Sequence, residues 1–249
     1  MGWTAIWHDQ EPQLVREFFG SARNGYFVEV GANDPHELSQ TWHLETLGWT
    51  GVLIEPQPAL AARLARARVA SVFAAACTSP QNAGRTMPFY VAGPHSALDR
   101  DRMTHGATPE QVIEVPTRTL DSILEEADAP SPIDFLSVDV EGHELEVLRG
   151  FNFARWRPRL IVVEDHVEGL AKHWFIQSHG YRLIRRVGHN GWYVPDESDV
   201  RATWDERCRI VRKYYLALPF RMGRNGLRRV RQRFNGLRRV RQRLWNARR

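Results

Sequence analysis

The sequence predicts an α/β fold with a doubly wound, mostly parallel sheet that closes with a C-terminal antiparallel hairpin. Short runs of β-branched and aromatic residues alternate with stretches of helical periodicity between residues 25 and 195, which is the pattern of strands joined by crossover helices. These runs carry little polar alternation, as expected for strands buried on both faces. Two last apolar runs, joined by a turn at Gly188, predict the hairpin.

The N-terminal part predicts a cap followed by the first strand. Residues 1–24 place aromatic and apolar side chains at mostly helical spacing, so they are expected to pack on the sheet. The first strand is expected at residues 26–30. It ends at Gly31, whose missing side chain lets the backbone approach another group. A turn follows, and a helix is expected from Leu38 to Leu47.

The remaining elements are expected to alternate in the same way. Strands are expected at residues 51–55, 72–77, 133–139, 160–164, 181–187 and 191–194, and helices at residues 58–68, 120–126, 144–150 and near 168–178. Residues 89–91 favour an extended piece. Residues 92–117 show no clear period and are expected to form a long loop or lid.

Charge divides the chain into two parts. The net charge of +5 combines residues 1–206, which hold all 29 acidic residues and 18 basic ones, with residues 207–249, which hold 16 basic residues. We therefore expect one folded domain over residues 1–206 and a basic C-terminal arm over residues 207–249.

The arm is a short duplication rich in arginine. Residues 225–234 recur almost letter for letter as residues 235–244, and residues 221–249 contain 12 arginines. Apolar residues recur every three or four positions, so a helix lying on an anionic membrane surface is one interpretation. A solvated, disordered arm is another. Nucleic-acid binding is disfavoured, because the domain is acidic and lacks a nucleic-acid-binding motif.

Other bulk features favour a reducing cytoplasm. Cys77 and Cys208 are the two cysteines, and their spacing predicts neither a disulfide framework nor a zinc site. No apolar run approaches the roughly 18 residues of a membrane span. The first residues lack the basic and apolar regions of a secretory signal. A cytoplasmic location is expected, and the arm could hold the protein peripherally on the inner membrane face.

Acidic residues gather where the predicted strands end. In a doubly wound sheet the carboxyl ends of the strands face one crevice, where ligands bind. Glu55 ends the second strand, which is where a carboxylate accepts hydrogen bonds from a ribose diol, so a nucleoside ligand is expected. The strand-end groups are Glu29 with Gly31, Glu55, Asp139 with Glu141, and Glu164 with Asp165.

The first turn indicates which nucleoside fits. A dinucleotide or P-loop site needs several glycines, whereas this turn has only Gly31 and also carries Asp34, which would repel a phosphate. A cationic ligand such as S-adenosylmethionine is favoured. Glu29 would support the turn or meet the ammonium group, and Asn33 could bind the amino-acid end. Cys77 would lie near the adenine, although a merely buried cysteine is the alternative.

Four segments then resemble, in order and spacing, the FkbM-type methyltransferase family. They are Phe27–Asp34, Trp49–Pro56, Asp134–Gly150 and Arg157–Glu164. The resemblance implies a class I S-adenosylmethionine-dependent fold over about residues 25–195. It implies that Gly31 and Glu55 bind the cofactor and that Asp139 lies at the reaction centre. It also implies methylation of hydroxyl oxygens on sugars or natural products.

The chemistry requires help in removing a proton from the acceptor hydroxyl, because an alcohol is a poor nucleophile at neutral pH. His143 and His166, each near a strand-end acid, are the candidate bases. Asp139, Glu164 and Asp165 could together hold Mg²⁺ through oxygen ligands.

The predicted function is S-adenosylmethionine-dependent O-methylation of a hydroxyl on a saccharide or lipid-linked glycan. N- or carboxyl-methylation of a small molecule is an alternative. A further alternative is a non-catalytic protein that binds a nucleoside or glycan.

Overall fold

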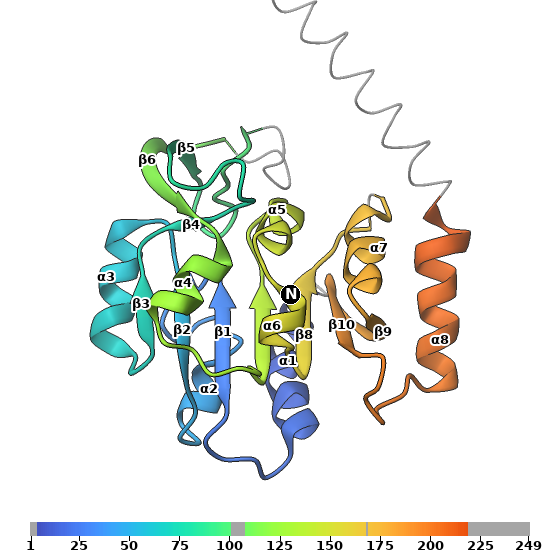
Figure 1. The fold of residues 1–249 in the computed structure, drawn as a ribbon. Coiled ribbons are helices and arrows are strands. Elements are labelled where there is room, and N and C mark those ends of the chain that lie inside the picture. Colours follow the sequence, from blue (N-terminus) through green and yellow to red (C-terminus); the bar gives the residue numbers. More distant parts are fainter. Residues whose placement is uncertain (1–3, 101–107, 168, 219–249) are drawn as a thin grey trace, which may run out of the picture.

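A computed structural model describes residues 4–100, 108–167 and 169–218. Its main sheet has seven strands in the order β3-β2-β1-β7-β8-β10-β9 (Figure 1). The first five strands in this order are parallel, and β10 runs antiparallel to both β8 and β9. The bounds are β1 (Tyr26–Val30), β2 (Thr50–Ile54), β3 (Ser71–Phe73), β7 (Phe135–Val138), β8 (Leu160–Glu164), β9 (Tyr181–Val187) and β10 (Asn190–Pro195). The predicted mostly parallel sheet with a closing hairpin is confirmed.

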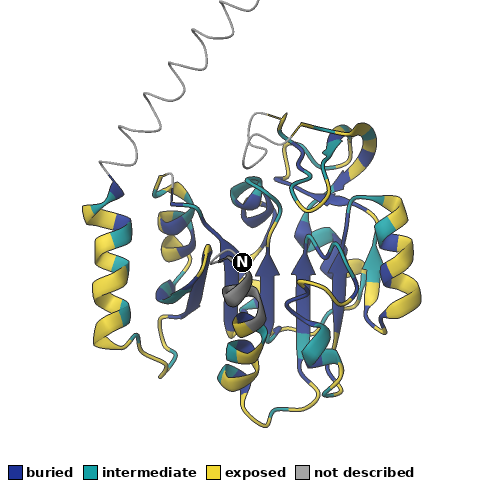
Figure 2. Ribbon diagram, turned by 180° about the vertical axis from the view of Figure 1, so that it is seen from behind, coloured by how far each residue is buried: buried dark blue, intermediate teal, exposed yellow. Residues whose placement is uncertain are grey.

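Helices cover both faces of this sheet (Figures 1 and 2). One face packs against α4 (Leu120–Glu126), α5 (Glu144–Arg149), α6 (Phe153–Trp156) and α7 (Ala171–Ser178). The other face packs against α1 (Thr4–Phe19), α2 (Trp42–Glu45) and α3 (Pro58–Ala67). The outward sides of these helices remain exposed, while the central strands are buried.

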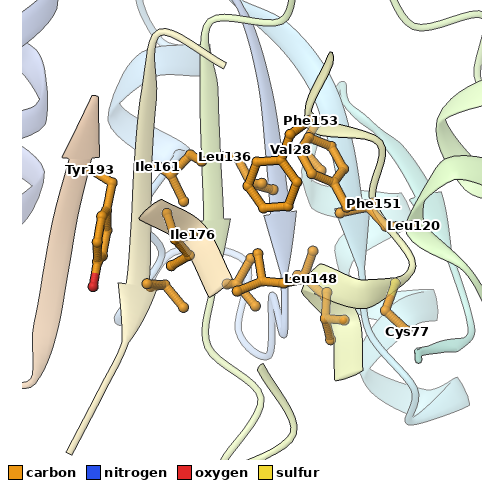
Figure 3. Close-up of a cluster of buried hydrophobic side chains, with 14 of the residues drawn as sticks. Val28, Cys77, Leu120, Leu136, Leu148, Phe151, Phe153, Ile161, Ile176 and Tyr193 are labelled. Atoms are coloured by element: carbon orange, nitrogen blue, oxygen red, sulfur yellow. The ribbon is translucent and has the colours of Figure 1, made fainter. Parts of the chain in front are cut away.

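The alternation of side chains along a strand explains why the central strands have continuous apolar sequences. Successive side chains of a strand point to opposite faces. Val28 therefore joins the cluster on the face of α4 to α7, where Leu136 and Ile161 also lie (Figure 3). Phe27 and Phe135 join the cluster on the opposite face. Because both faces are covered, most positions in these strands carry an apolar residue.

A second, three-stranded sheet has the order β4-β6-β5 and lies beyond the carboxyl ends of the central strands (Figure 1). Its strands are β4 (Ala76–Cys77), β5 (Thr86–Val91) and β6 (Gln111–Arg118). This arrangement corrects two predictions. The single strand predicted at 72–77 is divided between β3 and β4, which belong to different sheets. The loop predicted at 92–117 contains β6, whose mostly exposed residues give little apolar signal.

The helix predicted from Leu38 to Leu47 is also wrong in extent, since only α2 is helical there. Leu38 has a φ of +63°. The segment just before α2, residues 39–41, is held in a loop by the buried Glu29 carboxylate. This carboxylate accepts hydrogen bonds from the Gln40 main-chain N–H at 2.7 Å and from the Ser39 and Thr41 hydroxyls. The apolar spacing of this segment is therefore overridden by a tertiary contact.

The boundary expected between the folded domain and the basic arm, after residue 206, falls inside a helix. α8 (Trp204–Ile210) continues into a π-helical turn, η3 (Val211–Leu216). Tyr214 is fully buried there and donates a hydrogen bond of 2.8 Å to Asp165. Residues 221–249 lie outside the described residues. No helix in the described ranges is long and apolar enough to span a membrane.

Gly31 makes the tightest junction between the central strands. Its φ is +88°, and an added Cβ would lie 1.8 Å from the main-chain oxygen of Asp139. The Asp139 N–H donates to the oxygen of Val30 at 3.0 Å. The ends of β1 and β7 can meet in this way only with glycine at position 31.

We expect Gly31→Ala to lower the free energy of unfolding by about 2–5 kcal/mol, since left-handed backbone strain of about 1–2 kcal/mol adds to overpacking of about 1–3 kcal/mol. Gly84→Ala is the matched control, because Gly84 has a φ of +73° but nothing within 4 Å of an added Cβ. It should cost about 1–2 kcal/mol, the strain alone. Urea titrations give both values, and equal losses would contradict the close contact at Gly31.

Candidate functional site

The carboxyl ends of four adjacent strands meet at one edge of the main sheet. Gly31 follows β1, Glu55 follows β2, Asp139 follows β7, and Glu164 ends β8. The small sheet lies over this edge (Figure 1). The structure therefore brings together most of the strand-end groups that the sequence singles out, at the edge where ligands of doubly wound folds bind.

A narrow, mainly apolar cavity lies between this edge and the small sheet. Gly31 and Ile54 line it from the main sheet. Cys77, Phe89 and Leu98 line it from β4, β5 and the loop that follows β5. Burial raises the pKa of the Cys77 thiol to about 12, so this cysteine forms a neutral wall and not a reactive group.

A wider opening adjoins the cavity. It is lined by Met87, Tyr90, Leu98, Asp99, Arg100, His143 and Glu146. Leu98 and His143 line both spaces. The two spaces therefore meet at these side chains. The first is narrower and mainly apolar, and the second is more open and mixed in polarity.

Glu29 and Glu55 act first as anchors of the backbone. The Glu29 carboxylate accepts hydrogen bonds from the loop of residues 39–41, as described above, and so supports that loop. Glu55 accepts one hydrogen bond from the N–H of Asn33 at 3.0 Å and another from the N–H of Gln57 at 2.9 Å. Burial raises the pKa of both carboxyl groups. Each oxygen of Glu55 retains a second acceptor position.

Three carboxylates form an acidic cluster at the ends of β7 and β8. Asp139, Glu141 and Glu164 each place an oxygen within 4.8 Å of the other two. Enclosure by protein raises the pKa of Asp139 well above its usual range, and the negative charge of Glu164 adds to this rise, although the side chain keeps an exposed surface. Burial, then the charges of Glu144 and Glu141, raises the pKa of Glu164 to about 8. Asp139 and Glu164 therefore disfavour ionising at the same time.

The neighbouring acid Glu144 is neutralised within the protein. It accepts hydrogen bonds from the N–H of Gly142 and the ammonium group of Lys172, both at 2.7 Å. Burial alone would raise the pKa of Glu144, but the Lys172 charge lowers it. Glu144 thus supports the start of α5.

Asp165 is not part of the acidic cluster of Asp139, Glu141 and Glu164, which corrects the metal-ligand set predicted from the sequence. Its carboxylate accepts hydrogen bonds from Tyr214 at 2.8 Å and from the N–H of Val167 at 2.9 Å. It follows Glu164 directly, and neighbouring residues of a strand point to opposite sides. Asp165 therefore ties the C-terminal helix to the sheet, while Glu141 takes the third place in the cluster.

The two candidate bases lie in different surroundings. His143 lies between the cavity and the wider opening, with Nε2 3.0 Å from the hydroxyl oxygen of Thr78. His166 lies beside the acidic cluster, with Nε2 2.9 Å from Glu164 Oε1, and its ring contacts that of His189. His143 is thus the histidine that faces both spaces.

The model of the FkbM methyltransferase domain matches residues 29–183, which is more than half of the chain. The chain belongs to the FkbM methyltransferase family. The match begins at Glu29 and includes every strand from β2 to β8, the acidic cluster and both candidate bases. Membership of a methyltransferase family implies S-adenosylmethionine as the methyl donor.

Two individual proteins are similar to this FkbM-family chain. The hexuronic acid methyltransferase AglP of Haloferax volcanii is 38% identical over 63 residues, which cover 25% of this chain and 26% of that protein. A crystal structure of a methyltransferase FkbM from Methylobacillus flagellatus has 16% sequence identity and a TM-score of 0.45, covering 69% of this chain and 43% of that one. The matched parts thus span about a quarter of the first protein and less than half of the second.

The sequence does not identify several residues that line the site of this FkbM-family chain. Tyr90 lies in a predicted extended piece and Arg100 in a predicted loop, because β5 and the residues around it show no strong hydrophobic periodicity. Glu141, which the sequence marks only as a strand-end acid, stands two positions after Asp139 in a tight turn with Gly142. That spacing could have suggested that both carboxylates turn toward the same point.

Proposed function

We propose that this protein transfers a methyl group from S-adenosylmethionine to a hydroxyl oxygen of a saccharide. The observation that carries the proposal is the meeting of a narrow, mainly apolar cavity and a more open space of mixed polarity at His143, beside a cluster of carboxylates. The name of one relative, a hexuronic acid methyltransferase, supports a saccharide acceptor.

The enclosed cavity suits the nucleoside part of the donor. Ile54, Cys77 and Phe89 offer apolar surface to a purine, and Glu55 keeps free acceptor positions for a ribose diol. Asp139 and its acidic neighbours suit a positively charged sulfonium or ammonium group. The doubly wound sheet and its antiparallel hairpin support the class I assignment that the family resemblance implies.

The donor, when bound, supplies a methyl group on a positively charged sulfur. The protein has to align the acceptor oxygen with it, and good alignment supplies up to about 7–11 kcal/mol of the barrier in ideal cases. His143 is placed where an acceptor oxygen entering from the wider opening would meet the donor, and its Thr78 contact orients the ring. We assign His143 as the general base that takes the hydroxyl proton. His166 remains the alternative, beside Glu164.

The wider opening suits a sugar ring. Tyr90 and Met87 provide partly exposed apolar surface from β5, while Arg100 and Glu146 provide polar groups of opposite charge. Carbohydrates bind to such combinations of flat apolar and polar surfaces. A small N-acceptor or carboxyl acceptor could enter the same opening. A protein that binds without catalysis is the other alternative, and product analysis separates all three.

For donor binding, we expect Glu55→Ala to weaken the affinity for S-adenosylhomocysteine by about 1–3 kcal/mol, roughly 5- to 150-fold, because the ribose diol loses its buried acceptor. Calorimetry on the full chain measures this. Glu197→Ala is the matched control, since Glu197 lies beyond β10 at the opposite end of the sheet and pairs with Arg157. Equal affinities for both variants would contradict the donor site. Thermal unfolding of Glu55→Ala excludes loss of the fold as the cause.

For the reaction, we expect label from methyl-labelled S-adenosylmethionine to enter saccharides, including uronic-acid glycans and lipid-linked glycans, as a base-stable methyl ether. Asp139→Asn should lower turnover at least tenfold and should lower donor affinity by a smaller factor. Mild base distinguishes carboxyl methylation, because it releases methyl esters and leaves methyl ethers and N-methyl groups intact, and identification of the methylated product separates the last two. Base-labile label would indicate carboxyl methylation. Tight donor binding without any transfer would indicate a non-catalytic protein.

For the basic arm, we propose peripheral attachment to an anionic membrane through residues 221–249, where a lipid-linked acceptor would lie. A truncation after residue 218 keeps the buried Tyr214 and Leu218. The full chain should sediment with vesicles containing anionic lipid, and the truncated chain should not. Binding of the full chain should fall as salt rises. Equal sedimentation of both chains would contradict the role of the arm.

A further inference from the structure

We propose that the outer face of the C-terminal helix, which comprises α8 and η3, lies in the surface layer of an anionic membrane. Its exposed stripe consists of Trp204, Cys208, Val211 and Tyr215. These residues follow one another at intervals of four, three and four, the spacing of one face of a helix. Trp204 is 77% exposed and Val211 47%, and the outer side of α8 lies at the edge of the molecule (Figure 2). A row of large exposed apolar side chains marks an interaction surface.

The inner side of the same helix is fixed to the domain. Tyr214 is fully buried and donates a hydrogen bond of 2.8 Å to Asp165, and Ile210 packs against the core. Arg185 of β9 donates to Glu206 at 2.5 Å. The exposed stripe is therefore a fixed surface of the folded domain, distinct from the basic arm that follows it.

Two exposed arginines border the stripe. Arg207 stands one position before Cys208, and Arg212 stands one position after Val211. Since each residue turns a helix by about 100°, the two guanidinium groups lie on opposite flanks of the stripe. Arginine stems can lie along apolar surface while their charged ends reach lipid phosphates. This is the arrangement of a helix that lies in the plane of a membrane surface.

The charge around the stripe favours an anionic membrane over a second copy of the chain. Asp205 is the exposed acid of this helix, whereas residues 207–249 hold 16 basic residues and no acidic ones. A second copy would bring another segment of the same charge to this face, and like charges repel. Anionic headgroups supply the opposite charge, and the lipid beneath them takes up the apolar side chains. The arm thus provides most of the attraction, and the stripe fixes the orientation of the domain.

The position of the helix links this surface to the candidate functional site. The contact of Tyr214 places η3 beside Asp165, which directly follows Glu164 at the carboxyl end of β8. A chain that lies on the membrane by this face would hold the candidate site close to the surface, where a lipid-linked saccharide would be found. This consequence rests on the proposed function, whereas the membrane contact itself does not depend on methyl transfer.

Cys208 provides the probe, because it is exposed within the stripe while Cys77 is buried. A nitroxide spin label is attached to Cys208 of the full chain, and electron paramagnetic resonance is recorded with vesicles of phosphatidylcholine and phosphatidylserine. We expect the label to become more accessible to oxygen, which concentrates in lipid, and less accessible to a water-soluble nickel complex. Vesicles of phosphatidylcholine alone should cause neither change. Cys208→Ser shows how much signal arises from Cys77.

Substitutions test the apolar contact on the unlabelled full chain. Trp204→Ser and Val211→Ser should lower the partition coefficient onto the same vesicles at least fivefold and threefold, because each removes apolar surface and leaves the charge unchanged. Val69→Ser is the matched control and should bind as the original chain does. Val69 is 86% exposed and precedes β3, at the opposite edge of the main sheet from β9. Thermal unfolding shows that the variants are folded.

A label on Cys208 that stays in water while the full chain sediments with vesicles would overturn the stripe contact and leave attachment by the arm standing. Spin–spin broadening between labels in the absence of vesicles would overturn it in favour of a second copy. Unchanged partition of folded Trp204→Ser and Val211→Ser variants would overturn it as well. A label immersed in lipid on a chain that transfers no methyl group supports the membrane contact and contradicts the proposed function.

Discussion

The contact between Gly31 and the main-chain oxygen of Asp139 is the constraint on which the rest of this site depends. It joins the ends of β1 and β7 at the centre of the sheet, with the Asp139 N–H bonded to Val30. With these two ends fixed, β2 and β8 on either side place Glu55 and Glu164 at the same edge. A bulkier residue at position 31 would separate the strands and move the groups on both sides.

The carboxylates near the strand ends of this protein divide into two kinds by their partners. Glu29 and Glu55 accept main-chain N–H bonds and thereby fix the loops after β1 and β2, which contain no regular helix to hold them. Asp139, Glu141 and Glu164 instead lie close to one another. A protein tolerates such repulsion only where another interaction compensates for it. This contrast separates supporting acids from candidate functional acids better than sequence position does.

The sequence predicts the main sheet well because burial on both faces leaves an unmistakable apolar run in β1, β2, β7 and β8. It predicts the small sheet poorly, since β6 is mostly exposed and β4 has two residues. The assignment of Asp165 to the metal site failed because adjacent residues of a strand face opposite ways. The place of Glu141 depends on a turn with positive φ, which a sequence does not display directly.

The small sheet explains how an otherwise open strand edge becomes a site with two different spaces. β4 contributes Cys77 and β5 contributes Phe89 to the enclosed cavity, while Tyr90 of β5 faces the wider opening. Phe89 and Tyr90 are neighbours in one strand and line different spaces, and Met87 of the same strand also lines the wider opening. An exposed, weakly predicted sheet thus supplies walls for both spaces at this strand edge.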